Sequence, residues 1–126
     1  MTPGPVPWTD GPVTVSLTEF TARRFRDLPG IIRNGVGLRR GWWAMPGAIG
    51  VMLYLDPAKK QGGSLSVWAG DDDLRRFVAL PRHVAIMRRY RELVSVRAAV
   101  WQTDGFRTAD AWAQRHERLA AAAARA

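Results

Sequence analysis

The spacing of apolar and polar residues predicts where the β-strands lie. In residues 12–18 valine and leucine alternate with threonine and serine, and residues 94–101 alternate with the same period of two. Residues 48–55 form a short apolar run that ends at Asp56-Pro57, and residues 64–68 alternate again after a polar loop. These patterns are typical of strands, so we predict four, with 48–55 and 64–68 paired as a hairpin.

Helical spacing predicts two helices in the second half of the chain. Three carboxylates at residues 71–73 stand where the positive end of a helix dipole favours them, and apolar residues follow in helical register up to Val78. Pro81 interrupts this helix, which restarts over residues 83–93. A last helix begins at Ala109 and runs into an alanine tract.

Residues 19–45 carry two conflicting patterns. Apolar residues recur there at roughly helical spacing, and Asp27 and Pro29 are placed like the first residues of a helix. Against a helix stand four glycines, each of which costs a helix interior about 1 kcal/mol relative to alanine. The pair Asn34-Gly35 is moreover a strong signal for a β-hairpin. The local pattern leaves both interpretations open.

The order of the elements predicts an α+β domain. Strand, helical segment, strand, strand, helix and strand is the ferredoxin-like βαββαβ arrangement, a four-stranded antiparallel sheet with helices on one face. The strands at 64–68 and 94–101 carry apolar or aromatic residues on both sides, so the second face also needs cover. We therefore expect a homodimer in which two sheets pack together.

Length and composition limit the chain to one domain and exclude several chemistries. The 126 residues, 47% of them apolar, are enough for a single core. The absence of cysteine excludes a disulfide, a cysteine zinc site, an iron–sulfur cluster and a thiol nucleophile. We expect residues 1–12, rich in proline and glycine, to be a flexible lead, residues 13–102 to be the domain, and residues 103–126 to be a C-terminal helical extension.

The net charge of +8 does not by itself predict a nucleic-acid partner. Basic surfaces that bind nucleic acid are clustered on one face, whereas most arginines here fall in pairs spread over two separate helical regions. No apolar run reaches the ~18 residues of a membrane span, and the N-terminus does not resemble a signal peptide. We expect a cytoplasmic protein with neither a nucleic-acid partner nor a membrane span.

Four short patterns in the middle of the chain resemble a known family. They are Pro46-Gly47, the strand end Ser66 to Trp68, the acidic helix start Asp71 to Phe77, and the helix segment His83 to Met87. In this combination, over about residues 13–102, the chain resembles the dimeric α+β barrel superfamily, and within it the antibiotic biosynthesis monooxygenases and spheroidene monooxygenase. The resemblance implies that residues 19–45 are helical, interrupted near Pro29, and that a small-molecule cavity lies between the sheet and its own helices.

Three residues are candidates for catalysis. The resemblance implies that Trp68 forms an aromatic wall of the cavity; a core tryptophan is the alternative. His83 is the better acid or base of the two histidines, because an imidazole can transfer protons near neutral pH; a helix cap is the alternative. Arg97 could stabilise a phenolate or enolate, or form a salt bridge at an edge or a dimer interface.

Four further residues are candidates for substrate binding. Tyr54 could donate a hydrogen bond or cover the sheet face, and Trp101 lies on the same side of its strand as Arg97. Trp43, together with Trp42 and Met45, could form the cavity mouth or pack in the core. Met87 lies on the apolar stripe of its helix. We expect the six tryptophans to share one small core.

The resemblance implies a range of activities, among them oxidation of polycyclic aromatic compounds without flavin or metal. The sequence shows no metal-ligand cluster, since its two histidines are far apart. Our hypothesis is a monooxygenase-like enzyme of specialised metabolism, such as antibiotic biosynthesis, that acts on an apolar polycyclic or polyene molecule without a bound cofactor. Cyclisation or rearrangement in a shaped cavity is a second reaction class. The alternative is a non-catalytic protein that binds a small molecule, or haem with His83 as axial ligand.

Overall fold

A computed structural model describes residues 1–125, so the last residue of the predicted extension, 126, lies outside it. One antiparallel sheet in the strand order β1-β3-β4-β2-β5 forms its centre. The strands are β1 (Thr2–Pro3), β2 (Val13–Ala22), β3 (Ala48–Asp56), β4 (Gln61–Trp68) and β5 (Val94–Thr103). The four predicted strands and the β3–β4 hairpin are thus confirmed. The two-residue strand β1, which extends the sheet beyond β3, was not predicted.

Helical segments connect the strands and follow them. They are η1 (Phe25–Asp27), α1 (Leu28–Arg40), η2 (Trp42–Ala44), η3 (Pro57–Lys59), α2 (Asp71–Val78), α3 (Pro81–Tyr90), α4 (Thr108–Ala113) and α5 (Arg115–Arg125). The acidic helix start is confirmed at α2, where Asp71 accepts hydrogen bonds from Thr14 Oγ1 at 2.6 Å and Gln102 Nε2 at 2.7 Å. These bonds attach the first turn of α2 to strands β2 and β5.

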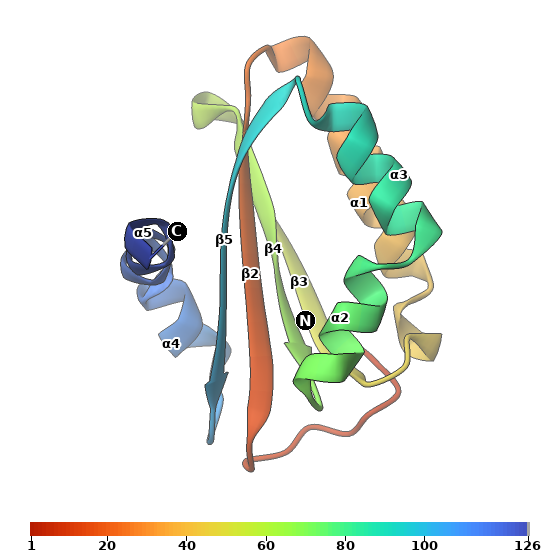
Figure 1. Cartoon of the computed structure of the whole chain (residues 1–126), viewed down its shortest axis with the longest axis vertical. Helices are drawn as coiled ribbons and strands as arrows, with labels where there is room; N and C mark the ends of the chain where they lie inside the picture. The colour runs from red at the N-terminus through yellow and green to blue at the C-terminus, as the bar shows by residue number, and fades with distance from the viewer. Residues whose placement is uncertain (126) are drawn as a thin grey trace.

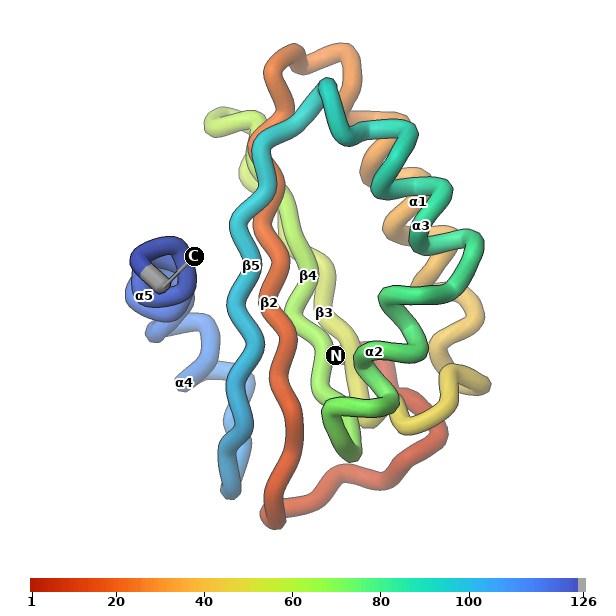
Figure 2. The backbone as a smooth tube through the Cα atoms, in the orientation of Figure 1, coloured from red at the N-terminus to blue at the C-terminus, as the bar shows by residue number. Residues whose placement is uncertain are grey.

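The prediction of helix over residues 19–45 is confirmed only in part. Residues 19–22 continue strand β2, because they pair with β4 on one side and β5 on the other, and this pairing outweighs the local helical spacing. Figure 2 shows β2 and β5 running side by side along their whole length. The helix α1 begins only at Leu28 and includes Asn34-Gly35, so no hairpin forms there.

Close approach of α3 explains why glycines occur inside α1. A Cβ atom at Gly30 would lie 2.8 Å from Tyr90 Oη, and one at Gly37 would lie 2.7 Å from Arg82 Nη2. Asn34 Nδ2 donates hydrogen bonds to the carbonyl of Gly30 at 2.8 Å and to Tyr90 Oη at 2.9 Å. The glycines therefore leave room for side chains of α3.

The helices of the βαββαβ unit lie on one face of the sheet, as predicted, and the C-terminal helices cover the other face (Figure 1). Figure 1 shows α1, α2 and α3 on one face and α4 and α5 on the other. On the second face a core of apolar residues joins the sheet to the C-terminal helices: Val13, Val15, Leu17, Ile49, Leu65, Val67, Ala99, Phe106, Ala111 and Leu119. The face that was expected to be bare is thus covered within one chain, and the homodimer stays a prediction that needs another interface.

The six tryptophans do not share one core, contrary to our expectation. Trp42 and Trp68 are 2% and 0% exposed and pack with Val51 and Leu74 between the sheet and the helices. Trp43 is 74% exposed, and Trp8 and Trp112 are also exposed. Among residues 1–125 no helix combines the length and the apolar character needed to cross a membrane.

Candidate functional site

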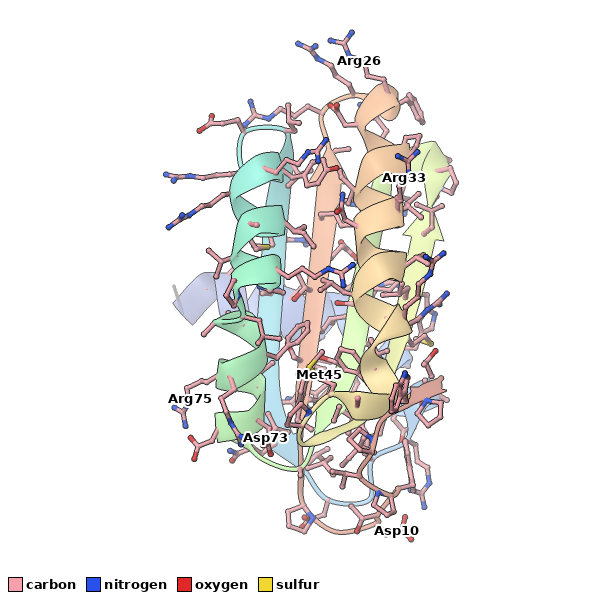
Figure 3. All side chains as sticks on the ribbon, turned by 90° about the vertical axis from the view of Figure 1, so that its right-hand side faces the viewer. Asp10, Arg26, Arg33, Met45, Asp73 and Arg75 are labelled. Carbon is pink, nitrogen blue, oxygen red and sulfur yellow. The ribbon has the colours of Figure 1, made fainter. Side chains whose placement is uncertain are left out.

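A cavity of about 530 Å³ lies between the sheet and the helices α1, α2 and α3. Its walls are mostly apolar, with Phe20, Leu53 and Val96 from the strands and Ile31, Leu38 and Ile86 from the helices. Figure 3 looks onto this side of the molecule, where α1 and α3 run in front of the sheet. The position agrees with the cavity that the sequence resemblance implies, and its volume suits a small organic molecule.

Four aromatic rings, here called the aromatic cluster, form one end of the cavity: Trp42, Trp68, Phe77 and His83. Ring centroids are 5.2 Å apart for Trp42–Trp68, 5.4 Å for Trp42–Phe77 and 4.9 Å for Phe77–His83. Trp42, Phe77 and His83 line the cavity, whereas Trp68 lies behind them and is fully buried. The indole of Trp68 donates a hydrogen bond to Ser66 Oγ at 2.9 Å, so its polar atom is not free for a ligand.

His83 lies at the start of α3, two residues after Pro81, and its ring is half-buried. Burial lowers the pKa of the imidazole below its ordinary value of 6.5, and the nearby carbonyl of Val78 offsets this only in part. That carbonyl does not reach hydrogen-bond geometry, so Nδ1 is buried without a partner in the described chain. His83 is therefore neutral at pH 7, the form that can accept a proton.

Trp42 supplies a second unpaired polar atom to the same end of the cavity. Its Nε1–H is buried and finds no acceptor among the described residues. A buried donor without a partner costs free energy, about 1–3 kcal/mol, and a ligand oxygen would satisfy it. Three hydroxyl side chains on the sheet, Thr18, Ser64 and Ser66, also line the cavity. The arrangement can thus bind an apolar molecule, donate a hydrogen bond to its oxygen and remove a proton from it.

No protein-family model and no curated protein matches the sequence of the chain. Solved structures with a similar arrangement of helices and strands do exist. SnoaB, a cofactor-independent oxygenase from Streptomyces nogalater, aligns over 78% of this chain and 97% of its own, with 20% identity and a TM-score of 0.57. A protein from Deinococcus radiodurans, provisionally named an antibiotic biosynthesis monooxygenase, aligns over 75% of this chain and 94% of its own, with 11% identity and a TM-score of 0.61. The chain has the fold of the antibiotic biosynthesis monooxygenases.

The shared fold confirms the fold that the sequence resemblance implied. A protein from Lactobacillus acidophilus NCFM, provisionally named a monooxygenase, aligns over 82% of this chain but 50% of its own, with 13% identity and a TM-score of 0.62. At these identities the likeness establishes the arrangement of elements and not the chemistry.

Within the antibiotic biosynthesis monooxygenase fold, the predicted site residues divide between the two faces of the sheet. His83 and Met87 line the cavity, and Trp68 supports its wall. Arg97 and Trp101 lie on the opposite face, because residues alternate along β5 and it is Val94 and Val96 that face the cavity. The structure therefore does not bring Arg97 to the cavity.

Tyr54 and Trp43 also lie outside the cavity. Tyr54 shares the second face with Arg97, because its neighbour Leu53 takes the cavity side of β3. Trp43 points to solvent, and the adjacent Trp42 lines the cavity instead. The sequence offered no means of choosing between two consecutive tryptophans, and the predicted site includes Trp43 but not Trp42.

Arg97 and Tyr54 instead bind a buried carboxylate on the second face. Glu19, 2% exposed, accepts hydrogen bonds from Arg97 Nη2 at 2.5 Å and Tyr54 Oη at 2.9 Å, and Arg115 Nε lies 3.6 Å from its Oε2. Burial alone would raise the pKa of Glu19, but these bonds and charges outweigh it and hold the pKa below 4.5. Burial and Glu19 raise the pKa of Tyr54 far above its ordinary value, so Tyr54 stays a hydrogen-bond donor.

Proposed function

We propose that this protein is a cytoplasmic monooxygenase of specialised metabolism that acts on an apolar polycyclic or polyene molecule without flavin or metal. The observation that carries the proposal is the pairing, at one end of a mostly apolar cavity, of a neutral imidazole whose Nδ1 is buried and an indole N–H without an acceptor. The fold shared with SnoaB, a cofactor-independent oxygenase, supports it by analogy.

The chemistry needs a substrate with an acidic C–H bond, such as a CH₂ group between two aromatic rings that are also joined through a carbonyl. His83 removes a proton and leaves a delocalised enolate, and Trp42 Nε1–H donates a hydrogen bond to the enolate oxygen. The enolate passes an electron to O₂, and the two radicals combine to a peroxide anion that takes back the proton from His83. This hydroperoxide loses water to give a ketone. One oxygen atom ends in the ketone and the other in water, and the substrate CH₂ supplies all four electrons.

The proposal is tested by following O₂ consumption and ketone formation with a tricyclic anthrone and protein purified without added cofactor. His83→Gln should lower kcat by about 10²-fold or more, the usual contribution of a general base. Because only neutral His83 accepts a proton, kcat/KM of the wild type should be constant near pH 7. It should fall below a pKa under 6.5, and His83→Gln should remove that decline.

Two controls make this result specific. Trp42→Phe keeps an aromatic ring but removes the N–H, so it should lower kcat more than it raises KM. His116→Gln changes the other histidine, which is exposed on α5, and should leave turnover unchanged. Wild-type turnover in both His83→Gln and Trp42→Phe would refute the assigned roles.

A non-catalytic protein that binds haem or another small molecule is the second candidate. It is favoured by the same feature of His83, since a neutral imidazole with an unpartnered nitrogen is also a suitable iron ligand. His83 would hold the haem iron, and the group would supply redox chemistry when bound. A Soret band in the purified protein that disappears in His83→Gln, without O₂ consumption on any anthrone, would favour this candidate over oxygenation.

A further inference from the structure

Three arginines line the cavity, and no carboxylate lines it in the described part of the chain. Arg39 comes from the end of α1, Arg88 from the last turn of α3, and Arg91 from the residue that follows α3. The cavity is otherwise almost wholly apolar. A cleft with charges of one sign and apolar walls focuses the electric field, so this cavity attracts anions.

The salt bridges of the described chain use other arginines. Salt bridges join Arg75 to Asp72, Arg76 to Asp73, Arg107 to Asp10, and both Arg97 and Arg115 to Glu19. Arg39, Arg88 and Arg91 make no salt bridge and no side-chain hydrogen bond within residues 1–124. Glu92, which follows Arg91 in the sequence, does not line the cavity.

Arg88 and Arg91 lie at the end of the cavity away from the aromatic cluster. Helices α1 and α3 run antiparallel, since Gly30 meets Tyr90 and Gly37 meets Arg82. Arg88 and Arg91 are three residues apart, which places them on one side of the helix. They follow His83 by five and eight residues, about 7–12 Å along the helix axis at about 1.5 Å per residue.

This spacing fits a ligand with an anionic group at one end and an apolar body at the other. We propose that the cavity binds an apolar compound that carries a carboxylate or a similar oxyanion, with Arg88 and Arg91 holding the anion and the apolar body reaching His83. The proposal rests on the function proposed above and names the class of its substrate. Arg88 and Arg91 are exposed, whereas Arg39 is half-buried. An anion bound to the exposed pair keeps part of its hydration, so its desolvation costs less free energy than it would at Arg39.

A matched pair of fluorescent probes tests the proposal: 9-anthracenecarboxylate and the neutral 9-anthracenemethanol, each titrated into the full-length protein. The wild type should bind the carboxylate at least about tenfold more tightly, as expected for charge-assisted hydrogen bonds. The preference should weaken as salt is raised. The double variant Arg88→Gln/Arg91→Gln should lose the preference and keep its affinity for the alcohol.

Control variants separate the possible results. Arg33→Gln removes an exposed charge of α1 that does not line the cavity (Figure 3), and it should keep the preference. Equal binding of both probes by the wild type would overturn the inference and leave the apolar cavity standing. A preference lost only in Arg39→Gln would overturn the assignment to the end of α3. Binding of neither probe would overturn this inference together with the proposed function.

Discussion

A single buried carboxylate joins three elements on the face of the sheet opposite the cavity. Glu19 comes from the middle of β2, and its partners Arg97 and Tyr54 come from β5 and β3, with Arg115 of α5 close by. The guanidinium of Arg115 lies over the ring of Trp112, 4.0 Å from its centroid, and 5.2 Å from that of Tyr54. The charges are therefore interlocked with aromatic packing between the sheet and the C-terminal helices.

Glu19→Gln should destabilise the fold without affecting turnover. The amide leaves Arg97 and Arg115 without a negative partner, which should lower the free energy of unfolding at pH 7 by about 1–3 kcal/mol. The folded-state pKa of Glu19 lies below 4.5, so its contribution is present above that pH and is lost as the pH falls through the folded-state value. Urea denaturation should show the gap between wild type and variant closing towards pH 3.

The exposed Glu92→Gln is the control for this variant, because it removes a carboxylate without a salt bridge in the described chain. It should leave the free energy of unfolding nearly unchanged at both pH values. A Glu19→Gln variant as stable as Glu92→Gln at pH 7 would mean that Glu19 contributes no net stability.

At the scale of residues, the alternation of side chains was predictable but the choice of face was not. The pattern of β5 shows that Arg97 and Trp101 share a side opposite Val96. Which side meets α1 and α3 depends on how helices far away in the sequence cover the sheet. His83 and Met87 could be placed because they lie on a helix that such a fold packs over the cavity side. Trp42 is a candidate because its buried N–H makes no hydrogen bond within the described chain, and no sequence pattern predicts such an absence.

At the scale of elements, strong local signals predicted α2 and α3 and weaker ones failed at β2 and α1. Three aspartates mark a helix start and Pro81 marks an interruption by their own chemistry. The structure has α2 beginning at Asp71 and α3 spanning Pro81–Tyr90, so the second helix begins two residues before the predicted restart and ends three residues earlier than predicted. The end of β2 is set by pairing to two neighbours, and α1 contains Gly30 and Gly37 where it faces side chains of α3. Both are tertiary effects, which override local propensity.

Two glycine substitutions in α1 should have opposite effects. Gly37→Ala meets only the flexible end of Arg82, so the gain in helix propensity should raise the free energy of unfolding by up to about 1 kcal/mol. Gly30→Ala meets the hydroxyl of Tyr90, whose ring is buried and cannot turn away, and it should break the bond from Asn34 and lower stability. Thermal unfolding of both variants beside the wild type measures the difference. Equal shifts would contradict the close packing of α1 on α3 at Gly30.

At the scale of the whole molecule, the C-terminal helices decide what the sheet presents to other chains. Leu119 of α5 is 0% exposed and packs in the core shared with β2 and β4. The sequence predicted the helical extension but not its position, because an amphipathic helix at the end of a chain fits any apolar face, including that of a second copy. A homodimer through this face would need the face to be bare, and the C-terminal helices cover it.

Leu119→Asp tests whether α5 closes this face within one chain. A carboxylate at a fully buried position should release α5 from the sheet, because an unpaired buried charge is far more costly than the contacts that hold the helix. Light scattering should give the variant a larger and more concentration-dependent mass than the wild type, whether the wild type is one chain of 14.0 kDa or the predicted homodimer formed through another face. Ala120→Asp, which adds the same charge at an exposed neighbour, should behave as the wild type. A wild-type mass of two chains that Leu119→Asp leaves unchanged would show that the dimer forms elsewhere and that α5 does not prevent association.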